Sequence, residues 1–351
     1  MRCCSSARRS PPWSPGSASP STAARANRLI TDPPACAIRA AMTANCPVCS
    51  GSGTVLRRLG AEEIAHGLQA VFGQTPPAGA VPGDYDLVEC AGCGLVYADP
   101  MRAGGAALYD WLTSFAKYHA QARWEWTRIR DILRAEGRPL RLLELGAGQG
   151  DFLETLRDLP QVAAQGIDLS ERSVAKAKAR GLDVRRASLE DVIVEAAGTY
   201  DAVVLSHVLE HVATPGALMA AVGNLLAPGG RILFSVPYSP MSREYLHDDV
   251  MNLPPHHMTR WNIRALEGLA RVLGLDLETW MPKAKPAWKR ALKHTCDTIR
   301  GEGRVRGLAR LPVVLANWGT FRRVLADHRA RERVGGRPAA DTILVSLKRE
   351  K

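Results

Sequence analysis

The sequence predicts an α/β protein built on a doubly wound, mostly parallel β-sheet. Short apolar runs alternate with segments of helical periodicity, and the runs lie near 141–145, 162–168, 182–187, 200–206 and 230–237. Strands that alternate with helices form parallel sheets with helices on both faces. A glycine-rich turn follows the first run, and an acidic residue ends the second. Because ligands of such sheets bind at the carboxyl ends of the strands, these two features predict a binding site there.

The turn after the first strand carries glycine at every second position, at Gly146, Gly148 and Gly150, with Glu144 just ahead of them. Glycine lets the backbone turn sharply and approach a ligand closely. The helix expected to begin at Asp151 offers free N–H groups in its first turn. This strand–turn–helix segment therefore predicts a cradle for a nucleotide-like cofactor.

The glycine spacing distinguishes between cofactors. A dinucleotide-binding G-x-G-x-x-G turn needs a third glycine at position 151, where this chain has Asp151. A carboxylate at that position would repel a pyrophosphate, but it suits a ligand with a cationic sulfonium, an amino group and ribose hydroxyls. Asp168 ends the second strand about 20 residues after the glycines, where ribose hydroxyls are held in such folds.

At these motifs the chain resembles the class I S-adenosylmethionine-dependent methyltransferases, over residues 43–280 and 341–349. The E-x-G-x-G-x-G turn, the segment 200–206 with the turn after it, and the turn Pro228-Gly229-Gly230 follow one another in the order of that family. The resemblance implies a Rossmann-like sheet of seven strands whose last two strands form an antiparallel hairpin. It also implies S-adenosylmethionine (SAM) as the methyl donor.

The resemblance assigns the donor site to residues near the ends of four strands. In the family, the glycine turn and the acid of the second strand hold the donor, the end of the third strand contacts adenine, and the turn after the fourth strand lines the pocket. The matching residues are Glu144, Gly146, Ala147, Gly148, Gly150, Asp168, Leu169, Ser188, Leu189, Glu190, Ser206 and His207.

One segment matches a second pattern. His207-Val208-Leu209-Glu210-His211 has the H-x-x-E-H spacing of a zinc-protease motif. That motif needs a helix that presents both histidines on one face. Here His207 directly follows a strand and Pro215 interrupts soon afterwards, so we expect a loop at the cofactor pocket, with His211 in a structural role.

Two C-x-x-C pairs lie upstream, and they comprise Cys46, Cys49, Cys90 and Cys93. Four thiolates at this spacing predict a closed, tetrahedral structural Zn²⁺ site in a small zinc ribbon over 42–100. A redox pair or four unrelated thiols are the alternatives. The 40 residues between Cys49 and Cys90 exceed the usual ribbon spacing. Because zinc-type spacing fits a reducing compartment, we expect a cytoplasmic protein, with peripheral membrane contact as the alternative.

The acceptor site is predicted from the loop after the fifth parallel strand. His257 or His256 is a candidate general base because the ordinary pKa of histidine lies near neutrality, and Tyr238 is a candidate orienting group. The alternative is that these histidines only pack or cap. Thr259 is the expected cap of the next helix. Methyltransferases that resemble this chain, including zinc-ribbon enzymes acting on nucleotide sugars and related metabolites, share such histidine loops. The sequence leaves open whether the acceptor atom is oxygen, nitrogen or carbon.

Four further segments complete the domain organisation. A helical lead-in over 101–138 precedes the SAM-binding core at 139–280, and the core sheet ends with a strand within 341–351. Between them lies a helical insert, 281–340, with 15 basic and 4 acidic residues. It is either a helical cap packed on the core, a surface for an anionic membrane or a lipid-linked acceptor, or a nucleic-acid site. No recognisable RNA-binding module accompanies it, which argues against nucleic acid.

Residues 1–41 are rich in serine, proline, alanine and arginine, and they predict a disordered tail. Met42 stands just before the first cysteine pair and is the expected native start; the alternative is a transit-type targeting tail. The whole chain predicts a methyltransferase acting on a small-molecule, sugar-nucleotide or lipid-linked acceptor. The alternatives are an RNA methyltransferase and a non-catalytic zinc- and SAM-binding scaffold. The oligomeric state stays open.

Overall fold

The computed structural model describes residues 45–115, 123–241, 244, 249–283, 285–300, 305–330, 333–334, 337–338 and 340–349. The predicted disordered tail 1–41 and the expected start at Met42 lie outside these residues, as does 116–122 of the lead-in.

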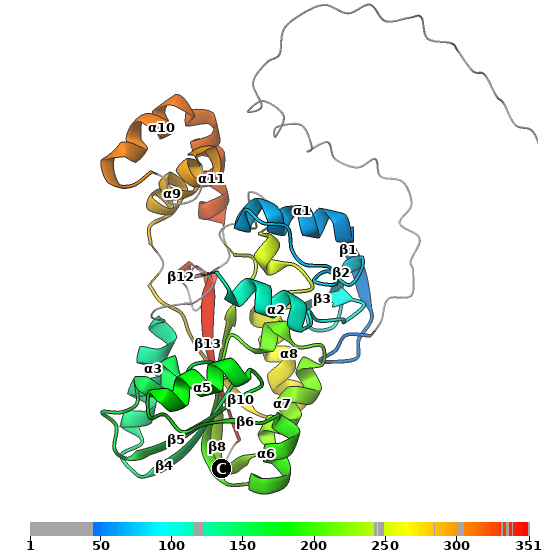
Figure 1. Ribbon diagram of the computed structural model, residues 1–351. Helices are drawn as coiled ribbons and strands as arrows, with labels where there is room; N and C mark the ends of the chain where they lie inside the picture. The colour runs from blue at the N-terminus through cyan, green and yellow to red at the C-terminus, as the bar shows by residue number, and fades with distance from the viewer. Residues whose placement is uncertain are drawn as a thin grey trace, which may run out of the picture. The chain divides into compact units, whose positions relative to one another are not determined.

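The main sheet has seven strands in the order β10-β13-β8-β7-β4-β5-β6 (Figure 1). Its members are β4 (Leu140–Leu145), β5 (Val162–Asp168), β6 (Val184–Arg186), β7 (Tyr200–Ser206), β8 (Leu226–Pro237), β10 (Asp276–Trp280) and β13 (Thr342–Lys348). Neighbouring strands from β8 to β6 pair in parallel, whereas β13 is antiparallel to both β8 and β10. The predicted Rossmann-like sheet of seven mostly parallel strands is confirmed.

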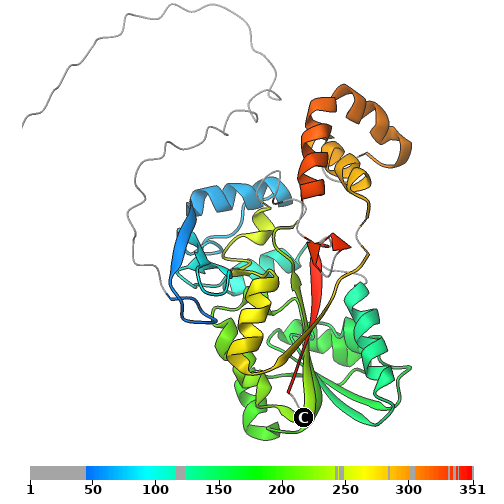
Figure 2. The ribbon, with the colours of Figure 1, turned by 180° about the vertical axis from the view of Figure 1, so that it is seen from behind.

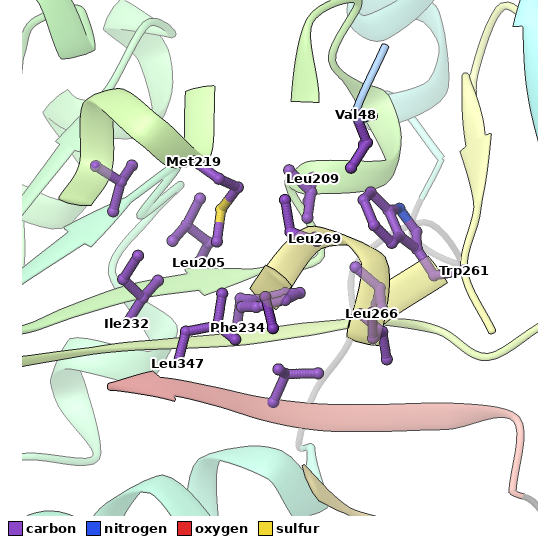
Figure 3. Close-up of a cluster of buried hydrophobic side chains, with 14 of the residues drawn as sticks. Val48, Leu205, Leu209, Met219, Ile232, Phe234, Trp261, Leu266, Leu269 and Leu347 are labelled. Atoms are coloured by element: carbon purple, nitrogen blue, oxygen red, sulfur yellow. The ribbon is translucent and has the colours of Figure 1, made fainter. Parts of the chain in front are cut away.

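Both faces of this sheet are covered at its centre, which explains why the central strands β13, β8, β7 and β4 are mostly apolar. Side chains alternate between the two faces of a strand, so Leu143 and Leu145 of β4 belong to one buried core and Leu142 to the other. Helices α7 (Pro215–Gly223) and α8 (Ile263–Leu273) cover the first face, and α3 (Trp124–Ala135) and α5 (Glu171–Ala179) cover the second (Figure 2). Figure 3 shows the first core, in which Leu205, Ile232 and Phe234 of the sheet meet Met219, Leu266 and Leu269.

Side-chain caps fix where several helices begin. Ser188 caps α6 (Leu189–Ala196) in a reciprocal capping box with Asp191. Asn262 caps α8, because its side chain accepts a hydrogen bond from the backbone N–H of Ala265. The expectation that Thr259 caps this helix is wrong: Thr259 lies in a short strand, and its Oγ1 accepts a hydrogen bond of 2.9 Å from Trp261 Nε1.

The cysteine-rich segment folds against the core and shares residues with it. Its sheet, β1-β2-β3-β9, takes its last strand, β9 (Thr259–Arg260), from the loop after β8. The remaining strands are β1 (Gly53–Leu59), β2 (Tyr85–Cys90) and β3 (Val96–Asp99), and α1 (Ala61–Phe72) occupies the long gap between the cysteine pairs. Val48 packs in the first core beside Leu209 and Trp261 (Figure 3). The sheet of the cysteine-rich segment is therefore completed by β9, a strand from the core part of the chain.

Between β10 and β13 the chain forms helices α9 (Ala287–Arg300), α10 (Arg310–Ala316) and α11 (Trp318–Ala330), with a 3-10 turn at Gly307–Ala309 before α10. They enclose a small core of their own, which contains Cys296, Val314, Phe321 and Val324. None of the helices in the described part of the chain combines the length and the apolar composition that crossing a membrane requires. The other helices are α2 (Ala106–Thr113) and the single turn α4 (Asp151–Glu154).

Candidate active site

A cavity of about 2170 Å³ lies at the carboxyl ends of β4, β5 and β7. Ordinary small-ligand pockets reach about 1000 Å³, so this cavity has room for two ligands of moderate size. The sequence-predicted residues that line it are Glu144, Gly146, Ala147, Gly148, Asp168, Leu169, Ser188, Leu189, Glu190, Ser206, His207, His256 and His257. Gly150 and Tyr238 are absent from its lining.

The turn after β4 depends on glycine for two different reasons. All three glycines have positive φ, at 70° for Gly146, 55° for Gly148 and 81° for Gly150, a region that residues with a Cβ rarely adopt. A Cβ on Gly146 would lie 2.8 Å from Val208 Cγ2, and one on Gly150 would lie 2.4 Å from Leu182 Cδ1. Gly146 and Gly150 therefore permit close packing as well as the turn, whereas Gly148, where a Cβ would meet nothing within 4 Å, is needed for its backbone conformation alone.

Asp168 is held rigidly at the end of β5. Its Oδ2 accepts a hydrogen bond from Gly148 N, and its Oδ1 accepts one from Ser170 N, each at 2.8 Å. A carboxylate offers about four lone-pair sites, so these two bonds orient the group and leave acceptor capacity toward the cavity. This arrangement suits a pair of neighbouring ribose hydroxyls.

Glu144 is a buried acid with an unsatisfied oxygen. Its side chain is 3% exposed, and within the described part of the chain Oε2 has no hydrogen-bond partner. Burial, followed by the charges of Asp168 and Asp151, raises the pKa of Glu144 well above its usual value. Asp151, in contrast, is paired with Arg180 at 2.7 Å. Glu144 is thus the acid that a cationic ligand would balance, which fits a donor that carries a sulfonium and an amino group.

We expect Glu144→Gln to raise the melting temperature of the ligand-free protein at pH 8, with a difference that shrinks toward pH 4. In the folded protein, Glu144 stays protonated at pH values above its ordinary pKa of 4.5. The stability that the protonated side chain contributes is therefore fully present below pH 4.5 and is lost as the pH rises toward the folded-state pKa. In a domain of this size, 1 kcal/mol corresponds to about 2–4 °C. Glu171→Gln, at an exposed glutamate, is the control, and equal pH profiles for both variants would contradict the assignment.

His207 lies between two carboxylates. It has a positive φ of 54°; its Nε2 lies 3.1 Å from Glu125 Oε1, and its Nδ1 lies 3.0 Å from Glu210 Oε1. Burial opposes its charge, but the hydrogen bonds to Glu125 and Glu210 raise its pKa above the usual value. Since both ring nitrogens are engaged, His207 has no lone pair for a metal, which agrees with setting the protease motif aside. Sequence reasoning missed Glu125, which comes from α3.

Three histidines meet at the other part of the cavity wall. His211 belongs to the 3-10 turn η2 (Leu209–His211), and His256 and His257 follow η3 (Val250–Asn252). Their ring centroids are 4.5 to 4.7 Å apart. Burial and the charge of His211 lower the pKa of His256 to about 3, and burial with the charge of His256 lowers that of His257 well below its usual value. These imidazoles are therefore neutral at physiological pH. The structure brings His211, expected to be structural, into the same cluster.

Tyr238 lies elsewhere. Its side chain is 0% exposed within the first hydrophobic core, and its backbone forms a bridge with Trp261. The prediction that Tyr238 orients the acceptor is not supported by this position, because Tyr238 immediately follows β8 and its side chain points into the core. Tyr109 of α2 faces the histidines instead: its hydroxyl lies 3.2 Å from His211 Nδ1.

The four predicted zinc ligands cluster. The four sulfur atoms all lie within 4.8 Å of one another. Cys46 Sγ is 3.7 Å from Cys93 Sγ, and Cys49 Sγ is 3.4 Å from Cys90 Sγ. Four sulfurs at about 2.3 Å from a tetrahedral zinc lie about 3.8 Å apart, so the cluster fits that ion. The hydrogen bond with Cys93 lowers the pKa of Cys46 and raises that of Cys93.

The chain is similar to known methyltransferases in sequence. A family model described as "Methyltransferase domain" matches residues 117–279. The "Ubiquinone biosynthesis O-methyltransferase" of Xanthomonas oryzae pv. oryzae (strain PXO99A) is 31% identical over 183 residues, which cover 46% of this chain and 76% of that protein. The protein of the same name from Bordetella avium (strain 197N) is 34% identical over 148 residues, which cover 39% of this chain and 58% of that protein.

Among solved structures, a SAM-dependent methyltransferase from Archaeoglobus fulgidus aligns with a TM-score of 0.43 at 15% identity, covering 64% of this chain and 92% of that chain. The family-model match begins after the cysteine-rich segment and ends before the helical insert. The match covers the glycine turn after β4, His207 with its two carboxyl partners, and the cluster of His211, His256 and His257. With 31% identity over 76% of a relative's length, the chain belongs to the class I SAM-dependent methyltransferases.

Proposed function

We propose that the protein transfers the methyl group of SAM to a hydroxyl oxygen on an aromatic small molecule, with or without a lipid tail. The observation that carries the proposal is the cluster of His211, His256 and His257 on the wall of the cavity that also contains the donor turn. Neutral imidazoles accept hydrogen bonds from hydroxyl groups. The relatives' name, which specifies O-methylation in ubiquinone biosynthesis, supports oxygen over nitrogen or carbon as the acceptor atom.

The donor would lie on the glycine turn. Asp168 would accept hydrogen bonds from the ribose hydroxyls, and Glu144 would balance the positive charge. Adenine would contact Leu169, which is 71% exposed toward the cavity, and the segment 188–190 at the start of α6. Ser206 accepts a hydrogen bond of 3.2 Å from Trp126 Nε1 and, with His207, would close the side nearest the methyl group.

The reaction would be an in-line displacement. A lone pair of the acceptor oxygen forms the bond to the methyl carbon, while the carbon–sulfur bond breaks and its electron pair stays on sulfur as S-adenosylhomocysteine. The protein contributes the alignment of oxygen and sulfur on opposite sides of the methyl group. His257 and His256, the predicted bases, would hold the hydroxyl. Their low pKa makes them acceptors of a hydrogen bond rather than strong bases.

The cysteine cluster would hold structural zinc. Cys46, Cys49, Cys90 and Cys93 supply all four positions of a tetrahedral site, which leaves none open for catalysis. Because Cys46, Cys90 and Cys93 are buried within the first core, the ion would fix the loop that carries β9 and, through it, the histidine loop.

The helical insert would place the protein on an anionic membrane that supplies a lipid-linked acceptor. Leu308, Leu311, Leu315 and Trp318 are 83%, 49%, 70% and 52% exposed. They come from the 3-10 turn before α10, from α10 itself and from the start of α11. Exposed apolar side chains within a segment that has 15 basic and 4 acidic residues match the composition of interfacial helices. α9 contributes His294 to the cavity lining, so the insert reaches the cavity in which the acceptor would bind.

One experiment tests the acceptor class. The full-length protein is given SAM with a labelled methyl group and either a soluble catechol or a prenylated catechol in anionic vesicles. We expect label on oxygen in both products. Leu311→Glu/Leu315→Glu is expected to lower turnover of the vesicle acceptor roughly tenfold or more, since each leucine contributes about 1.5–3 kcal/mol when buried in lipid, and to leave the soluble acceptor within twofold.

Leu56→Glu is the matched control, because Leu56 is 54% exposed on β1, outside the insert. It should leave both activities unchanged. Label on nitrogen or carbon with every acceptor would overturn the O-methyl proposal. Equal loss with the soluble and the vesicle acceptor would overturn the membrane role of the insert.

A further inference from the structure

We infer that His211, His256 and His257 form a binding site for a divalent transition-metal ion, with an open position that the acceptor hydroxyl would take. The catalytic part of this inference rests on the proposed O-methylation, whereas the metal site stands on the geometry of the histidines. The zinc predicted at the cysteines is a separate ion, because the two ligand sets share no residue.

The first observation is the convergence of three imidazoles. One ring nitrogen from each histidine lies within 4.8 Å of one from each of the other two. His256 and His257 stack with an interplanar angle of 17°, and both meet His211 edge to face. A turn after β7 and a loop 45 residues later thus present three ligands from two rigid segments.

The second observation is how each ring is held. The Nδ1–H groups of His211, His256 and His257 donate to His256 O at 2.7 Å, Met251 O at 2.8 Å and Asn252 Oδ1 at 2.9 Å. Donation from Nδ1 places the lone pair on Nε2 in all three rings. A metal-bound histidine almost always donates its other ring N–H to a carbonyl or carboxylate oxygen. The hydrogen bonds therefore preset the tautomer that a metal needs.

The third observation is negative charge beside the cluster. Glu210 is 0% exposed, its Oε1 lies 3.9 Å from His211 Nε2, and its Oε2 has no partner among the residues that the structure describes. Glu210 and Glu125 each place one carboxyl oxygen beside a ring nitrogen of His207, at 3.0 and 3.1 Å. Two buried carboxyl groups thus lie next to the histidine cluster, an environment that would favour a bound cation.

The ligand set indicates the class of metal. Three neutral imidazoles suit Zn²⁺, Fe²⁺, Co²⁺ or Ni²⁺, whereas Mg²⁺ prefers oxygen ligands. Three protein ligands with one open position are typical of catalytic rather than structural sites. A hydroxyl bound there would lose its proton to water at neutral pH, because the ion stabilises the anion. The oxygen lone pair would then form the bond to the methyl carbon as the carbon–sulfur bond breaks, so no strongly basic histidine is needed. With the ion bound, the Nε2 lone pairs would bind the metal, and the metal would take over from His256 and His257 the role of holding the acceptor hydroxyl.

Cobalt binding tests the inference independently of turnover. The full-length protein, with its cysteine site filled with zinc, is titrated with Co²⁺, and bound metal is counted by mass spectrometry after desalting. We expect one equivalent of Co²⁺, with visible d–d bands and no thiolate-to-cobalt charge-transfer band. His257→Gln and His211→Gln are each expected to weaken Co²⁺ binding by roughly 100-fold or more. His328→Gln, at another buried histidine 3.1 Å from His294, should leave binding unchanged.

Each outcome decides one question. A wild-type protein that binds no Co²⁺, or binds it as well after His257→Gln and His211→Gln, overturns the metal site even if catechols are methylated. Binding of S-adenosylhomocysteine by the two variants shows that their fold is intact. Metal binding without methylation of any hydroxyl acceptor would instead overturn the proposed function and leave the metal site standing.

Discussion

Asp168→Ala is expected to weaken binding of SAM and of S-adenosylhomocysteine by about 100-fold or more, which corresponds to about 2.7 kcal/mol. The side chain would lose its hydrogen bonds to two ribose hydroxyls, and each such bond to a charged group contributes about 1.5–3 kcal/mol. The change also removes the acceptor of Gly148 N and Ser170 N, so the glycine turn itself loses a support. Isothermal titration calorimetry with S-adenosylhomocysteine measures the effect.

Asp183→Ala is the matched control. Asp183 also accepts a hydrogen bond, from Gln165 Nε2 at 2.9 Å, but it is exposed and does not line the main cavity. Its variant should bind the product as the wild type does. If Asp168→Ala retained affinity within twofold of the wild type, the ribose of the donor could not lie against Asp168.

The largest expected effect on stability comes from the cysteine cluster. If zinc binds there as proposed, Cys93→Ser should lose it and lower the melting temperature by about 10 °C or more, because metal binding in such sites contributes several kcal/mol to folding and 1 kcal/mol corresponds to about 2–4 °C. Cys46, Cys90 and Cys93 belong to the same buried core as the sheet. Loss of the ion would therefore loosen the core as well as the cysteine-rich segment. Thermal unfolding and metal analysis of the same sample measure both effects.

Cys296→Ser separates loss of the metal from loss of a buried thiol. Cys296 is 0% exposed in the core of the helical insert, and its Sγ donates to Arg310 O at 3.6 Å. Its variant should retain zinc and lose only the few degrees expected for one buried group. Equal melting temperatures and equal metal content for the two variants would rule out a zinc site at the four cysteines.

Features that depend on neighbouring residues could be predicted well. The spacing of Gly146, Gly148 and Gly150 requires backbone shapes that only glycine adopts easily, and all three have positive φ in the structure. The strand after them ends in Asp168 because a parallel strand delivers its last side chain to the ligand edge. The spacing within each cysteine pair is likewise local, and the structure brings the two pairs together across the 40-residue gap, as four ligands of one ion would require.

Contacts between distant segments could not be predicted. Nothing local shows that Glu125 on α3 reaches His207, 82 residues later, or that His211 joins His256 and His257. The position of Tyr238 after β8 suggests the acceptor site, yet its side chain is buried in the first core, because strand alternation gives it the same face as Phe234 and Val236. Strand β9, the last strand of the cysteine-rich sheet, also comes from a loop that is distant in the sequence.

The sequence by itself determined the sheet, the donor turn and the class of reaction, since each depends on backbone conformation and on periodicity within a few residues. Only the tertiary structure decided which ionisable groups meet, how they share protons and which are neutral. Burial and the distance between charges set those properties, and both depend on how segments far apart in the chain pack together.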